Sequence, residues 1–168
     1  MIGAYGHWQE PENWYDTAQI CRNGHLINDS TVSNPQNNKN FCETCGEPTI
    51  NQCQHCNTPI QGYEHNGINS WSYTVPRFCR ECGKMYPWIA VRMEAARELV
   101  NELNLSEEEK EDLKRSMKDL MQDSPRTQVA SVKFKRLAAK AGTQAASMLR
   151  DVLVDVLSET AKKLLLPQ

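Results

Sequence analysis

The chain has 168 residues, with 19 basic against 21 acidic side chains and 39% hydrophobic residues. This length allows one medium domain or two small ones. It contains no run of about 20 apolar residues, which argues against a membrane-spanning helix. The first residues lack the basic flank and apolar core of a secretory signal, so we expect a cytoplasmic protein.

Composition divides the chain near residue 86. Residues 1–86 are rich in Asn, Gln, Gly and Pro, whereas the hydrophobic residues crowd into residues 87–168. The first segment cannot bury a large core, so another interaction must hold it together. Its first residues form an aromatic arm that is a candidate contact surface for a partner, made of Trp8, Trp14 and Tyr15.

Six of the seven cysteines form three C-x-x-C pairs, namely Cys42–Cys45, Cys53–Cys56 and Cys79–Cys82. Two intervening residues let a tight turn aim both thiolates at one metal ion. Gly46, Asn57 and Gly83 follow these pairs, and each tolerates the positive φ that such a turn requires. The spacing predicts zinc ribbons or knuckles with short β-strands, and a reducing compartment.

The seventh cysteine begins the stretch "CRNGH", from Cys21 to His25. Two tetrahedral sites need eight ligands, and Cys21 and His25 supply the two that are missing, with Asn23-Gly24 as the turn between them. In the alternative reading His25 is a surface histidine, and His7 is then the best substitute. We therefore predict two structural Zn²⁺ ions, held by Cys21, His25, Cys42, Cys45, Cys53, Cys56, Cys79 and Cys82.

Two ligand pairings remain open at this point. Sequential pairing joins the first pair to the second and the third to the fourth, whereas a cross-brace joins the first to the third. Sequential pairing closes shorter loops, but the entropy of loop closure grows slowly with length, so the preference is weak.

An enzyme is disfavoured. Catalytic zinc keeps an open coordination position, whereas these pairs fill one another's sites. The zinc deaminase signature has a Glu two residues after its His, whereas Ile27 stands two residues after His25. A zinc-dependent hydrolase is therefore the least favoured reading.

Electrostatics separates two further hypotheses. Residues 1–86 hold five basic and eight acidic residues, a net charge of −3. Bound zinc with its thiolates would bring this to about −6, which suits phosphate backbones poorly. Residues 126–140 instead form a basic helix on which Lys133, Arg136 and Lys140 share one face. This face is either a solvated surface or a site for nucleic acid.

Apolar periodicity predicts helices over about 88–103, 107–122 and 127–165, giving an α-helical module and an α+β protein overall. Ser106 and Glu109 have the spacing of a capping box, and Gly142 can bend or split the last helix. That helix has a broad apolar face that includes Leu149 and Val156. The face packs either against the other helices or against a second copy or partner, which would make a homo-oligomer.

The segments "CRNGH", "FCETCGEPT", "CQHCNTPIQG" and "FCRECGKMYPW", followed by a helical region, resemble a family of small bacterial two-zinc proteins of unknown function. The resemblance covers most of the chain, and the "FCRECGKMYPW" segment is its most specific part. It implies eight zinc ligands at the positions named above and no activity. We therefore expect a non-catalytic adaptor that acts through protein–protein contacts, with an unidentified protein partner.

Overall fold

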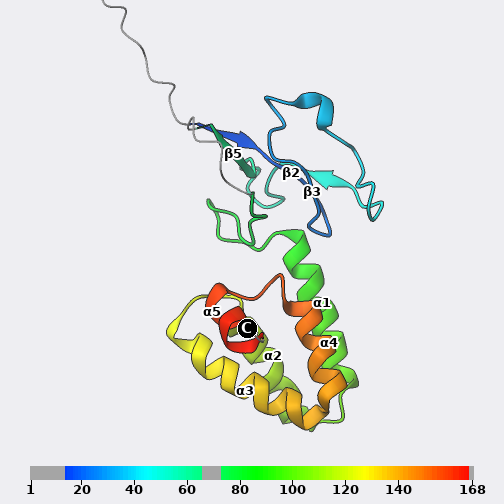
Figure 1. Cartoon of the computed structure of the whole chain (residues 1–168), viewed down its shortest axis with the longest axis vertical. Coiled ribbons are helices and arrows are strands. Elements are labelled where there is room, and N and C mark those ends of the chain that lie inside the picture. The colour runs from blue at the N-terminus through cyan, green and yellow to red at the C-terminus, as the bar shows by residue number, and fades with distance from the viewer. Residues whose placement is uncertain (1–13, 66–72, 167–168) are drawn as a thin grey trace, which may run out of the picture. The chain divides into compact units, whose positions relative to one another are not determined.

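The computed structural model describes residues 14–65 and 73–166, and the chain divides into two compact units, Met1–Trp88 and Ile89–Gln168 (Figure 1). The first unit carries short strands and the second is helical, which confirms the predicted α+β class. The elements of the first unit are β1 (Trp14–Thr17), β2 (Gln19–Cys21), β3 (Leu26–Asn28), the 3₁₀ turn η1 (Pro35–Asn37), β4 (Thr49–Ile50) and β5 (Gln61–His65). The helices are α1 (Pro87–Glu102), α2 (Glu107–Leu120), α3 (Pro125–Ala141), α4 (Thr143–Leu153) and α5 (Glu159–Leu165).

In residues 14–65 and 73–88, the first unit has two small antiparallel sheets and little apolar core. β1 pairs with β5, and the other sheet has the order β3-β2-β4. Ala18, Ile20 and Ile60 are completely buried. So few buried apolar side chains stabilise a unit of this size weakly, as the composition predicts.

A buried carboxylate compensates in part for that small core. Asp16 accepts backbone N–H groups from Val32 at 2.9 Å, Ser33 at 3.0 Å and Thr17 at 2.6 Å, and lies 3.5 Å from Nε2 of His65. Burial acts to raise the pKa of Asp16, but these hydrogen bonds to the charged form outweigh it and lower the pKa. The carboxylate therefore fastens the loop after β3 to the β1–β5 sheet.

Side chains cap the N-termini of α2 and α3. Ser106 accepts the N–H of Glu109, and the Glu109 side chain accepts the N–H of Ser106, so the predicted capping box is confirmed. Ser124 caps α3, which has Pro125 in its first turn. These signals separate α2 from α3, as the sequence predicts.

The single helical region predicted over 127–165 is divided into three helices. Gly142, at φ +109°, ends α3 and precedes α4, in a conformation that favours glycine. A second break, which the sequence analysis did not predict, follows Leu153. It ends at Ser158, which is buried, donates its N–H to the carbonyl of Leu120 at 2.9 Å and caps α5.

The apolar face of this region belongs to the core, so proposing Leu149 and Val156 as a contact surface was wrong. Both side chains are fully buried within the helical unit. Several neighbours on the same face are also buried, so the chain's own helices cover most of it, whereas Leu164 is 37% exposed. Leu149 and Val156 are therefore not available to a second copy, and the homo-oligomer itself stays a prediction. The buried neighbours are Leu153, Leu157 and Ala161.

Adjacent residues of α4 provide a direct comparison of core and surface. Leu149 is completely buried, whereas Met148 is 46% exposed. We expect Leu149→Ala to lower the free energy of unfolding of the helical unit by about 2–5 kcal/mol, because it leaves a cavity. Met148→Ala is the matched control, with an expected change within about 0.5 kcal/mol. Urea denaturation followed by circular dichroism measures both, and equal losses would contradict the assignment.

No helix in the described part of the chain is both long and apolar enough to cross a membrane.

Candidate metal centres

Three segments of the first unit repeat one backbone structure. In each, the first cysteine donates its N–H to a carbonyl five residues on, and the residue after the second cysteine donates back to the first. Gly46, Asn57 and Gly83 occupy that last position with φ of +75°, +59° and +66°. The left-handed turns inferred from the sequence are therefore confirmed at all three pairs.

The "CRNGH" stretch forms a fourth turn of a different kind. It joins β2 to β3, and Cys21 exchanges backbone hydrogen bonds with His25 and Gly24. Gly24 has φ +89°, which accommodates the extra residue between the two side chains. The His25 N–H also donates to Cys21 Sγ at 3.2 Å. A hairpin turn thus orients Cys21 and His25 toward the same point.

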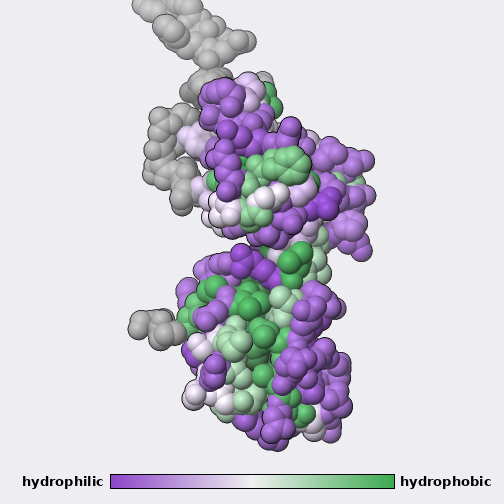
Figure 2. All heavy atoms as spheres, turned by 90° about the vertical axis from the view of Figure 1, so that its right-hand side faces the viewer, coloured by the Kyte–Doolittle hydropathy of each residue, from purple (hydrophilic) through white to green (hydrophobic). Residues whose placement is uncertain are grey.

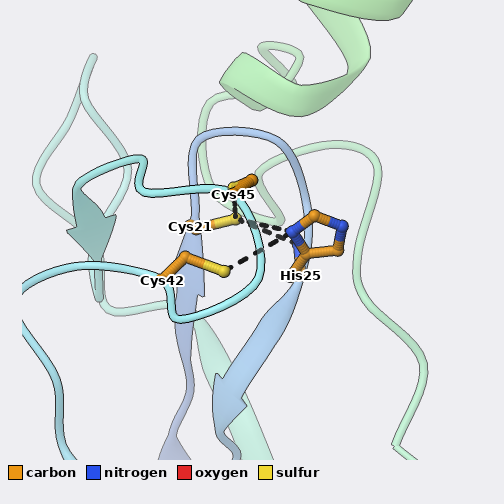
Figure 3. Close-up of side chains that lie close together, drawn as sticks. All are labelled: Cys21, His25, Cys42 and Cys45. Carbon is orange, nitrogen blue, oxygen red and sulfur yellow. Dashed lines mark hydrogen bonds between the residues drawn. The ribbon is translucent and has the colours of Figure 1, made fainter.

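The first tetrad joins this hairpin to the following C-x-x-C turn (Figure 3). Nδ1 of His25 lies 3.5 Å from the sulfurs of both Cys21 and Cys42, and the sulfurs of Cys21 and Cys45 are 3.8 Å apart. Figure 3 shows the three sulfurs and the imidazole nitrogen converging on one point. The structure therefore places the His25 imidazole in the tetrad. The alternative interpretation, in which His25 is a surface histidine, is not supported.

The second tetrad is made of cysteines alone, namely Cys53, Cys56, Cys79 and Cys82. The sulfurs of Cys53 and Cys82 are 3.7 Å apart, and those of Cys56 and Cys79 are 3.6 Å apart. The four pairs therefore meet in sequence order. The cross-brace arrangement that the sequence left open is not the one adopted.

These distances match those of a four-coordinate metal site. At the tetrahedral angle, a metal about 2.3 Å from each sulfur places two sulfurs about 3.8 Å apart, and a nitrogen ligand lies about 3.6 Å from a sulfur. The observed separations of 3.5–3.8 Å agree. A disulfide would instead bring two sulfurs to about 2.05 Å. The two Cys/His tetrads are thus consistent with two metal ions.

The knuckle backbones favour the thiolate form that binds metals. Backbone N–H groups of Cys82 and Glu81 donate to Cys79 and, against the effect of burial, lower its pKa to about 6. Burial likewise acts to raise the pKa of Cys42, but the N–H groups of Thr44 and Cys45 outweigh it and lower the pKa to about 6. The first cysteine of each of these turns is therefore prepared to lose its proton.

The remaining histidines lie away from the tetrads where they are described. His55 is exposed between Cys53 and Cys56, and its N–H donates to Cys53 Sγ at 3.5 Å. His65 stacks on Trp14, with ring centroids 4.1 Å apart. His7, the predicted substitute for His25, lies outside the described residues.

The predicted aromatic contact surface is described only in part. Trp8 lies outside the described residues, whereas Trp14 and Tyr15 on β1 are 43% and 46% exposed. The Tyr15 hydroxyl is hydrogen-bonded to Glu64, which raises the pKa of the phenol. Trp14 and Tyr15 are therefore accessible to a partner.

The basic face of α3 is exposed but partly neutralised. Lys140 forms an ion pair with Glu109 at 2.6 Å, and Arg126 forms one with Asp119 at 3.0 Å. Both acidic residues lie on α2. Lys133 and Arg136 are exposed on the same helix. Acidic side chains of α2 thus neutralise part of the positive charge of α3.

Two aromatic residues beside the tetrads were not predicted as such from the sequence. Tyr86 and Trp88 flank Pro87, and the "YPW" stretch contributed to the family resemblance. Both side chains are 3% exposed, and their rings stack with centroids 4.7 Å apart. The available signal was two large aromatic residues next to a C-x-x-C pair, in a segment with too few apolar residues to bury them otherwise.

Two Cys/His tetrads in the unit of short strands, followed by a helical unit, define an α+β protein with two candidate metal sites. A family model described as "Uncharacterized protein conserved in bacteria (DUF2321)" matches residues 14–165, and the chain belongs to this family. The resemblance seen in the sequence is confirmed. Comparison with curated proteins and with solved structures gave no match.

Proposed function

We propose that the protein is a non-catalytic interaction protein whose first unit is held together by two structural Zn²⁺ ions. The observation that carries this proposal is that each tetrad offers four ligand atoms within 4.8 Å of one another. Four protein ligands complete a tetrahedral zinc site and leave no position for water or substrate. Such a site contributes to folding, whereas a catalytic zinc has three protein ligands and an open position.

The donor set supports zinc over other metals. Seven thiolates and one imidazole are soft or borderline ligands, which suit Zn²⁺ and exclude the oxygen-seeking Mg²⁺ and Ca²⁺. An iron–sulfur cluster would place bridging sulfides between its thiolates, whereas these sulfurs lie at the spacing of a single ion. The residues therefore fit zinc. Bound zinc would hold the cysteine turns together and would have no catalytic role.

The interaction role draws on the exposed apolar surface of each unit. In the first unit, Trp14 and Tyr15 present aromatic rings at the β1–β5 sheet. In the helical unit, Figure 2 shows apolar residues gathered in a strip on one face. A groove of about 480 Å³ in this unit is lined by Leu99, Leu103, Ala145 and Met148. Exposed apolar surface of this kind supports protein–protein contact over catalysis.

Cobalt substitution tests whether the sites are closed. Co²⁺ takes the place of Zn²⁺ and reports its coordination in its visible absorption spectrum. We expect intense bands typical of tetrahedral thiolate sites, unchanged by added azide or cyanate, because no ligand position is open. A spectrum that shifts on adding these anions would show an exchangeable position and would return the zinc hydrolase to consideration.

A second candidate function is nucleic-acid binding through the basic face of α3. It is supported by Lys133 and Arg136, which are exposed on one helix with Arg126 and Lys140. The ion pairs of Lys140 and Arg126 with α2 reduce the charge available for phosphates. We therefore rank this function below protein binding.

A salt titration distinguishes the two functions. We expect only weak binding of duplex DNA or RNA, lost between about 50 and 200 mM salt. Replacing Lys133, Arg136 and Lys140 together by Ala should change this weak affinity little. Tight binding with a steep salt dependence, abolished in the triple variant, would instead establish the nucleic-acid function.

A further inference from the structure

The "YPW" stretch, Tyr86 to Trp88, connects the cysteine turn of one tetrad to the hairpin of the other. Tyr86 and Trp88 stack with an interplanar angle of 14°, and Pro87 between them fixes the backbone that separates their rings. The Tyr86 N–H donates to the carbonyl of Arg77 at 3.1 Å, and Trp88 Nε1 donates to the carbonyl of Pro76 at 2.9 Å. Both residues are therefore anchored to the short segment that precedes Cys79.

Tyr86 is fastened to the turn that carries two ligands of the second tetrad. The Cys79 N–H donates to the carbonyl of Lys84 at 2.9 Å, and Phe78 and Met85 pair as an isolated β-bridge. Tyr86 follows Met85 directly and is buried. The position of Tyr86 thus depends on the turn of Cys79, although Tyr86 is not one of the ligands.

Trp88 contacts the first tetrad through Gly24. Gly24 lies in the turn between Cys21 and His25, and a Cβ placed on it would be 3.0 Å from Cβ of Trp88 and 3.2 Å from Cγ. The indole therefore packs directly on the backbone that sets the spacing of the two ligands. Gly24 also has φ +89°, so both its conformation and its contact with Trp88 require glycine.

We propose that the stacked Tyr86–Trp88 pair couples the two metal sites, so that filling one tetrad raises the affinity of the other. This inference rests on the proposed zinc sites. Ordering the second site fixes Cys79 and Tyr86, which fixes the Trp88 ring against Gly24 and so prepares Cys21 and His25. By linkage the first site acts equally on the second.

The small core of this unit makes such coupling effective. Metal binding and folding are one event in units that lack a sufficient apolar core. The contacts of Tyr86 and Trp88 then form when the two metal sites form and are lost when the sites are lost. We expect coupling on the order of 10-fold in affinity, within the range measured for communicating sites.

Native mass spectrometry of the full chain during a chelator titration tests the proposal. The wild type should pass from two bound zinc ions to none with little one-zinc species. In Trp88→Phe the one-zinc species should accumulate, because the indole packing on Gly24 and the hydrogen bond to Pro76 are lost. Trp14→Phe is the matched control, since Trp14 stacks on His65, and it should behave as the wild type.

A second measurement separates coupling from loss of fold. Zinc affinity of the first site is compared between wild type and Cys82→Ser, with and without Trp88→Phe. In the wild-type background, Cys82→Ser should lower the zinc affinity of the first site about 10-fold. In the Trp88→Phe background, the same substitution should have little effect on that affinity. An abundant one-zinc wild type, or equal effects in both backgrounds, would overturn the coupling while leaving two structural zinc ions in place. A chain that binds no zinc would overturn the proposed function itself.

Discussion

Treatment of the full chain with a strong chelator under reducing conditions should unfold the first unit and leave the helical unit folded. The apparent binding free energy of a structural zinc site in small peptides is about 10–16 kcal/mol. The total stability of a typical domain is about 5–15 kcal/mol. Among the described residues of the first unit, few apolar side chains are fully buried, including Ala18, Ile20 and Ile60, so we expect metal binding to supply most of its stability.

Two-dimensional amide NMR measures this residue by residue. Signals from residues 14–65 should collapse to the narrow range of an unfolded chain, while those from residues 89–166 keep their dispersion. Returning zinc should restore the spectrum, and returning Mg²⁺ should not, because oxygen-seeking ions do not suit thiolates. Retention of dispersed signals from β1 to β5 after complete metal removal would show that apolar packing alone holds the unit.

His25→Ala should reduce the zinc content at limiting zinc from two ions per chain to one. His25 is one of four ligands, and an even share of the total binding free energy is about 2.5–4 kcal/mol. Its loss therefore costs roughly two to three orders of magnitude in affinity at the first site. Inductively coupled plasma mass spectrometry, after dialysis against a buffered zinc concentration, gives the stoichiometry.

His55→Ala is the matched control. His55 lies inside a C-x-x-C pair, yet its side chain is exposed and only its backbone N–H reaches Cys53. We expect this variant to keep both ions at wild-type affinity. Equal zinc loss from the two histidine variants would mean that the imidazole of His25 is not a specific ligand.

The metal-centre residues could be predicted from the sequence because the relevant physics is local. Spacing of two residues between cysteines, with Gly46 or Gly83 after them, determines a turn regardless of the rest of the fold. Counting ligands against the needs of two tetrahedra then identified Cys21 and His25. The pairing of the turns could not be decided in the same way, since loop entropy differs little between the two arrangements.

Two errors arose where tertiary packing decides. Periodicity shows that α4 has an apolar face but not what covers it, so Leu149 and Val156 were available to either a core or a partner. The break before Ser158 is set by its hydrogen bond to Leu120, a contact 38 residues distant in sequence that no local pattern reveals. The packing of Trp88 on Gly24 was hidden for the same reason.

The occupation of both tetrads by zinc is the central claim, and native mass spectrometry of the zinc-loaded wild type tests it most directly. The measured mass should correspond to one chain with two zinc ions and all seven cysteines free of disulfides. A chain that holds one ion at saturating zinc, or that carries disulfides between the paired cysteines, would contradict the account.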